Sequence, residues 1–205
     1  MAALASPADV EARLGRPFTP VEEARIDALL EDASAIIRAY TGQSFERVDD
    51  DVVVLRAVGG RLTLPQRPVI EVTRVEAVGG GEGLPDFALT DWTFDGIDTI
   101  RLGDGAVIIN LPEAWWDEDG YPGTYRVTYS HGWEQVPGDV LAVVCAMATR
   151  ALANPNNLRS ETVGSYSVTY AVPTTGDQLG LNLTRYERST LDRYRNKAAT
   201  VKVVR

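Results

Sequence analysis

The sequence is poor in the two residues that most often build metal and redox sites. It contains one cysteine, Cys145, and one histidine, His131, among 205 residues. A single cysteine excludes an intrachain disulfide. A zinc site within one chain needs three or four such ligands, and a metalloprotease helix needs two histidines. We therefore expect no metal centre, no cofactor and no disulfide framework.

Long apolar runs are also lacking. No stretch approaches the ~20 apolar residues that span a bilayer, and Met1–Ser6 has neither the basic region nor the apolar core of a secretory signal. Apolar residues nevertheless make up 44% of the chain, enough for a substantial core. We expect a folded protein without membrane association that assembles in a cytoplasm.

Basic charge is scarce except near the end of the chain. The net charge is −9, and residues 51–135 hold fourteen acids against six bases. Residues 136–205 instead hold nine bases against five acids. An acidic body argues against nonspecific DNA binding, which needs basic surface to displace the counterions of phosphates. The uneven charge predicts two surfaces with different partners.

Both ends of the sequence predict helices. Ser6-Pro7 and Gly15 bracket a short helix. Thr19-Pro20-Val21-Glu22 is a capping box, and Gly42 follows a run of helical periodicity, so residues 20–41 should form one helix. The segment Val140–Ala148 is apolar nearly all round and should lie at the centre, packed by that helix. Asn182 or Thr184 should cap a last helix that ends at Arg195 and places Tyr186 on one side with Leu183 and Leu191.

The middle of the chain predicts strands. Short β-rich runs alternate there with glycine turns, and Asp104-Gly105 between Thr99–Leu102 and Ala106–Leu111 predicts a hairpin. The predicted class is therefore α+β and discontinuous. Residues 1–45 and 131–195 form a helical core that includes a hairpin at 160–171, residues 46–130 form an inserted β module, and residues 196–205 form a C-terminal arm.

The only histidine offers little for catalysis. His131 lies in Tyr129-Ser130-His131-Gly132-Trp133, with Asp139 nearby, but no nucleophile motif accompanies it. A corner between strand and helix explains the segment better, with His131 bonded to backbone and Gly132 allowing the bend. We expect no enzymatic activity.

Three features suggest contacts with other proteins. Trp115 and Trp116 cannot both point into one face of a strand, so they are either interface aromatics or loop packing. The run Gly79, Gly80, Gly81, Glu82, Gly83 lacks a following Gly-Lys-Ser/Thr, so it reads as a loop tip that could project toward a neighbour or a lumen rather than as a phosphate loop.

The third feature is the basic end of the chain. A frayed, solvated tail is one interpretation. We favour an arm that docks on another protein, because Val-Lys-Val-Val has strand propensity and nothing local to pair with. Its residues are Arg185, Arg188, Arg193, Arg195, Lys197, Val201, Lys202, Val203 and Arg205.

Five motifs together resemble the head-to-tail connector (adaptor, or head-completion) proteins of tailed bacteriophages. They are Asp9–Gly15, Glu22–Phe45, Tyr129–Trp133, Val136–Val140 with the helix after it, and Glu161–Tyr170. The resemblance covers about residues 8–45 and 125–195. The β module between them is longer than expected of a minimal member.

That resemblance implies a structural role in the virion. Such proteins assemble as rings, commonly of about twelve copies joined head to tail, beneath the portal protein. The ring extends the channel for double-stranded DNA, without sequence-specific binding, and carries the stopper or tail-completion protein. The mixed-charge outer face of residues 20–41 suits one side of a ring contact, and an acidic lumen would let DNA pass without sticking.

Two other interpretations remain open from the sequence. The chain could be a different virion joint, such as a stopper or a tail-completion protein. It could also be a carbohydrate-binding or hydrolytic β module, supported only by Trp92, Trp115 and Trp116 and by abundant carboxylates.

Overall fold

A computed structural model describes residues 2–78, 86–103, 124–154, 160–163, 166–169 and 181–195. Its helices and antiparallel sheets confirm the α+β class. Several predicted sites lie outside these residues: Gly79, Gly80, Gly81, Glu82, Gly83, Trp115, Trp116, Lys197, Val201, Lys202, Val203 and Arg205.

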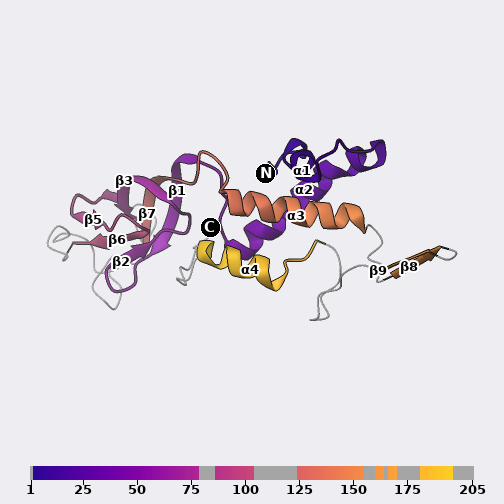
Figure 1. The fold of residues 1–205 in the computed structure, drawn as a ribbon. Helices are drawn as coiled ribbons and strands as arrows, with labels where there is room; N and C mark the ends of the chain where they lie inside the picture. The colour runs from indigo at the N-terminus through magenta and orange to yellow at the C-terminus, as the bar shows by residue number, and fades with distance from the viewer. Residues whose placement is uncertain are drawn as a thin grey trace. The chain divides into compact units, whose positions relative to one another are not determined.

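The chain divides into two compact units (Figure 1). The helical unit consists of Met1–Thr41 and Gln135–Arg195, and the β unit is formed mainly by Gly42–Glu134. Segments from both sides of the strand region thus form one unit, with the strands inserted between them. No described helix is long and apolar enough to cross a membrane.

The helices of the first unit begin and end at the expected signals. Helix α1 (Pro7–Leu14) has a capping box on Ser6 and ends at Gly15, whose φ of 68° suits a residue without Cβ. Helix α2 spans Pro20–Thr41, α3 spans Gly138–Ala153, and α4 spans Arg185–Leu191, followed by the 3₁₀ turn η2 (Asp192–Tyr194). Thr184, rather than Asn182, caps α4.

Helix α3 forms the centre of the helical unit and packs against α2, as predicted. Burying each large aliphatic side chain stabilises the fold by about 1.5–3 kcal/mol. The buried side chains include Ile26, Leu30, Ala33 and Ile37 of α2 and Val140, Val143, Val144, Met147 and Ala148 of α3.

The β unit contains two antiparallel sheets. One has the strand order β1 (Val48–Arg56), β7 (Thr124–His131), β3 (Val69–Ala77) and β4 (Phe87–Ala88). The other has the order β2 (Arg61–Thr63), β6 (Thr99–Leu102) and β5 (Trp92–Phe94). One edge of β6 pairs with β2 and the other with β5. The predicted pairing of Thr99–Leu102 with Ala106–Leu111 was therefore wrong, because β6 has no edge left for it.

Alternate residues of the strands build the core between the sheets. Along β7, Tyr125, Val127 and Tyr129 are fully buried, which is the two-residue period of a strand with one face inside. Their partners include Val53, Leu55, Leu62, Leu64, Val75, Ala77 and Ile100.

The end of β7 forms the predicted corner. Gly132 has a φ of 95°, and a Cβ there would stand 1.9 Å from the carbonyl oxygen of Glu46, so glycine is required. The predicted backbone bond of His131 was wrong: its Nε2 lies 3.1 Å from Oδ2 of Asp51. The carboxylate was missed because β1 and β7 are far apart in the sequence.

Strands β8 (Ser160–Val163) and β9 (Tyr166–Thr169) pair antiparallel and form the hairpin predicted before the last helix.

Candidate functional site

The segment Thr184–Arg195 is fastened to the helical unit at three points. The first is a bidentate ion pair. Arg150 in the last turn of α3 donates to both carboxylate oxygens of Glu187, at 2.8 and 3.2 Å. The backbone N–H of Thr184 donates to the same carboxylate at 2.8 Å. Burial raises the pKa of Glu187, but these donors outweigh burial and hold it below its ordinary value.

The second point lies at the other end of α3. Asp139, in the first turn of that helix, accepts hydrogen bonds from the guanidinium of Arg193 and, at 2.7 Å, from the hydroxyl of Tyr194. Because Arg150 and Asp139 lie at opposite ends of α3, α4 and η2 run antiparallel along that helix.

The third point is the last turn of α2. The hydroxyl of Tyr40 donates to Oδ1 of Asp192 at 2.7 Å, and this bond raises the pKa of Tyr40. The guanidinium of Arg195 lies over the Tyr40 ring, 5.0 Å from its centre, a cation–π arrangement. The last described residue is therefore held against α2, which fixes the point where residues 196–205 begin.

The four described residues of the predicted arm fall into two groups. Arg193 and Arg195 contact Asp139, Asp192 and Tyr40 inside the unit, so they anchor the segment. Arg185 and Arg188 are exposed on α4. Nothing in the local sequence signals this division, because Asp139 and Tyr40 lie more than fifty residues away from Arg193 and Arg195.

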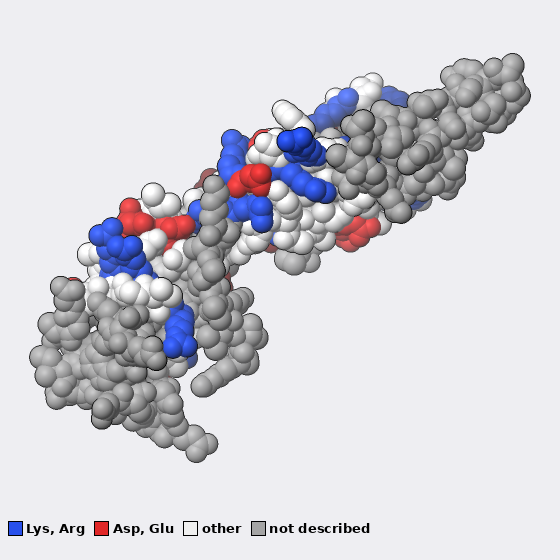
Figure 2. Space-filling view, turned by 90° about the horizontal axis from the view of Figure 1, so that it is seen from below, with Lys and Arg blue, Asp and Glu red and all other residues white. Residues whose placement is uncertain are grey.

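The exposed face of α4 also carries an aromatic side chain. Tyr186 is 81% exposed, whereas Leu183 and Leu191 are buried. Its predicted place beside those leucines was wrong: Glu187, about 100° around the helix from Tyr186, is buried with them instead. Figure 2 shows the side of the helical unit on which α4 lies, where arginine side chains gather.

Helix α2 presents an outer face of different character. The exposed acids Glu23, Asp27 and Glu31 follow one another at four-residue spacing, which places them on one side of the helix. Beside them runs a strip of exposed alanines at Ala24, Ala28, Ala35 and Ala39. The predicted mixed-charge face is therefore mainly acidic, because the side chains of Arg25 and Arg38 are partly buried.

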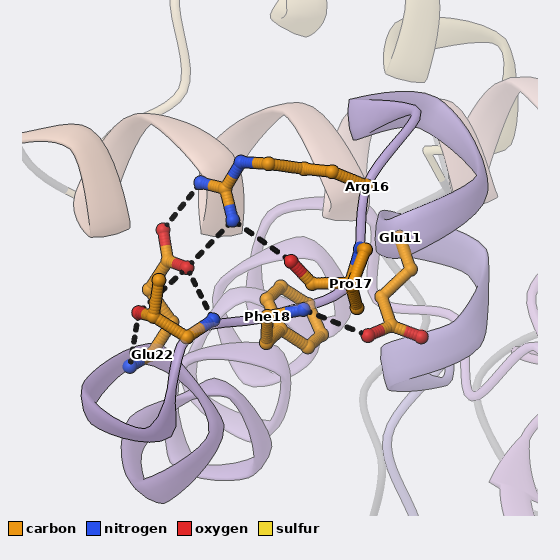
Figure 3. Close-up of polar contacts among 6 residues, drawn as sticks. Glu11, Arg16, Pro17, Phe18 and Glu22 are labelled. Carbon is orange, nitrogen blue, oxygen red and sulfur yellow. Dashed lines mark hydrogen bonds and ion pairs between the residues drawn. The ribbon is translucent and has the colours of Figure 1, made fainter.

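The corner between α1 and α2 holds this face in place (Figure 3). The guanidinium of Arg16 binds both carboxylate oxygens of Glu22 at 2.8 Å, and Glu22 also closes the capping box with Thr19. Phe18 N–H donates to Glu11 of α1 at 2.9 Å. The Arg16 contact lowers the pKa of Glu22 to about 2. Glu22 is therefore an internal contact, and Glu23 is the first free acid of the outer face.

The residues of the β unit that were candidates for catalysis or ligand binding make structural contacts. Ser130 Oγ accepts from the N–H of Asp50 at 3.2 Å, and the His131 ring packs on Tyr129 with centroids 4.9 Å apart. Trp92 packs against the β-unit core and donates to the carbonyl of Leu89. Among the residues that the structure describes, no group of three His, Cys, Asp or Glu side chains could hold a metal ion.

No protein-family model matches the chain, and no curated protein does. Among solved structures, a chain from the neck of an empty GTA particle computed with C6 symmetry is similar to it. The two are 20% identical, the match covers 96% of this chain and 90% of that chain, and the TM-score is 0.48. A likeness at this level establishes neither a family nor a function.

Proposed function

We propose that this chain is a structural subunit of a phage head-to-tail connector. It forms an adaptor ring of about twelve copies beneath the portal protein, extends the DNA channel and carries the stopper or tail-completion protein. It acts by assembly and performs no catalysis. Its place is the virion, after assembly in the host cytoplasm.

The order of the connector-like motifs supports this proposal. Asp9–Gly15 coincides with α1 and its C-cap, and Glu22–Phe45 with α2 and the residues after it. Val136–Val140 leads into α3, and Glu161–Tyr170 coincides with β8 and β9. Each of these motifs thus covers a helix or hairpin or leads into a helix.

The anchoring of Thr184–Arg195 is the observation that best supports the adaptor role. A segment that leads into a basic arm is tied to α2 and α3 by the Arg150–Glu187, Asp139–Arg193 and Tyr40–Asp192 contacts. Such an anchor transmits a load from the arm to the whole helical unit. In this proposal the arm, with Lys197, Val201, Lys202, Val203 and Arg205, docks on the portal, and the exposed Arg185 and Arg188 of α4 precede it in the chain.

The charge of the β unit suits a channel that passes DNA. Residues 51–135 carry a large excess of acids, and like charge keeps a duplex from sticking to the wall. We propose that acids of this region face the lumen. A ring whose lumen is lined by Lys and Arg contradicts this part of the proposal.

A truncation after Arg195 tests the role of the arm. The shortened chain keeps every anchor contact, so its melting temperature should match that of the full chain. In particle assembly it should fail to join portal-bearing heads, giving DNA-filled heads without tails. Normal particle yields with the truncated chain contradict the proposal.

A full-length control keeps this test independent of folding. Lys197→Gln, Lys202→Gln and Arg205→Gln together remove the charge of the arm but leave its length. Retention of this variant on portal heads should be weaker than that of the parent at low salt and should change less as salt rises, because fewer charged contacts remain for salt to screen. Retention equal to the parent at every salt concentration contradicts a charged arm.

A further inference from the structure

An open groove lies between α1 and α3 on the surface of the helical unit. Its volume is about 640 Å³, and its lining is mainly small and apolar, with Leu14 of α1 and Ala142, Cys145, Ala146 and Ala153 of α3. Cys145 is 1% exposed, and burial raises the pKa of its thiol. The α1–α3 groove therefore suits an apolar segment of protein rather than thiol chemistry.

The outer side of α2 forms a ridge of matching character. Val21 is 72% exposed, and the exposed Ala24, Ala28 and Ala35 follow it on the same side of the helix. Helix propensity explains an alanine at any helical position, but a β-branched valine has no such advantage. The α2 ridge, Val21 with these three alanines, is therefore an apolar line that a partner surface would cover.

The spacing along the two helices agrees. The side of α3 that lines the groove carries Ala142, Ala146, Thr149 and Ala153, and the outer side of α2 carries Ala24, Ala28, Glu31 and Ala35. Both sets follow steps of four, three and four residues, the heptad spacing of helices that pack along their length. Both also extend over about 16 Å of helix axis, so one strip can lie along the other.

The ridge and the groove point away from each other within one chain. Helices α2 and α3 pack together and bury the sides that they turn toward each other (Figure 1). The ridge and the groove lie on the opposite, outward sides, so the ridge of one chain can enter a groove only on another copy. A contact between two different faces of identical copies is heterologous, and its repetition generates a ring or a filament.

Charge favours the same occupant. Arg13 of α1 lines the groove and is exposed, and the exposed acids Asp27 and Glu31 flank the α2 ridge. Within the part of the chain that the structure describes, none of the three forms an ion pair. The charges of ridge and groove are therefore complementary, whereas the basic end of the chain would be repelled by Arg13.

We propose that the α2 ridge of one copy docks in the α1–α3 groove of the next copy, head to tail. Val21 and the alanines fill the groove, and an acid beside the ridge, Asp27 or Glu31, pairs with Arg13. This inference rests on the proposed function, since it names the contact that joins neighbouring subunits of the ring.

Enlarging either surface tests the contact. Ala28→Arg puts a long basic side chain on the ridge opposite Arg13, and Ala146→Glu puts an acid in the groove opposite the acids of the ridge. Each variant should self-associate at least about tenfold more weakly than the parent in sedimentation experiments. Both alanines are exposed, so the melting temperatures should stay at the parent value.

A matched control separates this contact from a general effect of charge. Ala12 is exposed on the side of α1 away from its buried residue Val10, outside both surfaces. Ala12→Arg and Ala12→Glu should associate as the parent does. Equal losses in these controls, or a parent chain that stays monomeric at about 1 mM, overturn the proposal.

Disulfide cross-linking gives the decisive outcome, because Cys145 is the only cysteine of the chain. In a Cys145→Ala background, one chain carries Ala28→Cys, a second carries Ala146→Cys and a third carries both. After oxidation the third chain should give a ladder of dimers, trimers and longer products on a denaturing gel without reductant. An equal mixture of the first two chains should give dimers, and each of them alone should stay monomeric.

Two results contradict the head-to-tail contact. Strong dimers of the Ala28→Cys chain alone would show that two ridges meet in a symmetric contact. The absence of a ladder, both for this pair and for Ala24→Cys with Ala142→Cys, overturns the docking of ridge in groove. Failure of the proposed function is distinguishable, because labelling of assembled particles locates the chain whatever face joins its copies.

Discussion

Arg150 and Glu187 form a bidentate ion pair that ties the end of α3 to the start of α4. Glu187 is 6% exposed, so its charge depends on this partner. Arg150→Met leaves that carboxylate buried with Thr184 as its remaining hydrogen-bond partner, and we expect a loss of about 2–4 kcal/mol in the free energy of unfolding. Denaturant titration measures it.

The double variant with Glu187→Met is the matched control, because it removes both charges and keeps apolar volume. It should recover most of the stability lost in the single variant. Equal losses in the single and double variants would show that the two side chains act independently.

The Arg16–Glu22 contact predicts an acid-dependent component of stability. The folded pKa of Glu22 is about 2 against 4.5 for the free group. A depressed pKa stabilises the fold above the unfolded value, and the contribution disappears as the pH falls from about 4.5 to about 2. The melting temperature of Glu22→Gln should therefore lie below that of the parent at pH 7 and approach it near pH 2.

Glu23→Gln removes an equal charge from the same turn of α2 without touching Arg16. The difference in melting temperature between Glu23→Gln and the parent should not disappear as the pH falls from about 4.5 to about 2. If the melting temperatures of both variants approach that of the parent to the same extent, the effect comes from net charge and not from the ion pair.

Gly132 predicts a backbone constraint at the end of β7. Alanine there would hold its Cβ 1.9 Å from the Glu46 carbonyl oxygen at a φ of 95°. We expect Gly132→Ala to reduce the free energy of unfolding by about 2 kcal/mol or more. Gly138→Ala, where nothing lies within 4 Å of the added carbon, should be neutral or slightly stabilising. Similar melting temperatures for the two variants contradict this account.

The centre of α3 predicts the largest packing effect. Met147 is fully buried in the helical unit, whereas Ala146 on the same helix is exposed. Met147→Ala should cost about 2–5 kcal/mol, because it loses burial and leaves a cavity. Ala146→Ser should change stability by less than about 0.5 kcal/mol. Chemical denaturation of both variants compares them directly.

The sequence predicted most of the local structure because the signals are local. The capping box at Thr19 and the glycines at positions 15 and 42 located α1 and α2 to within a residue or two. The apolar character of Val140–Ala148 identified the central helix for the same reason, because the residues that indicate its helical period and its burial lie in one segment.

The pairings between distant segments could not be predicted in this way. Strand β7 lies between β1 and β3, and no turn residue encodes that register. The Tyr40–Asp192 bond joins residues 152 positions apart. Whether an arginine near the end of the chain contacts the helical unit or is exposed depends on such distant partners. The sequence therefore predicted the arm residues as one group and could not separate the anchoring arginines from the exposed ones.

Imaging of the assembled particle tests the central claim most directly. With a small density tag on the N-terminus, electron cryo-microscopy of particles from cells that express this chain should place the tag in a ring of about twelve copies directly beneath the portal. Particles that lack the chain, or that carry it in the tail tube or the capsid shell, would contradict the adaptor role.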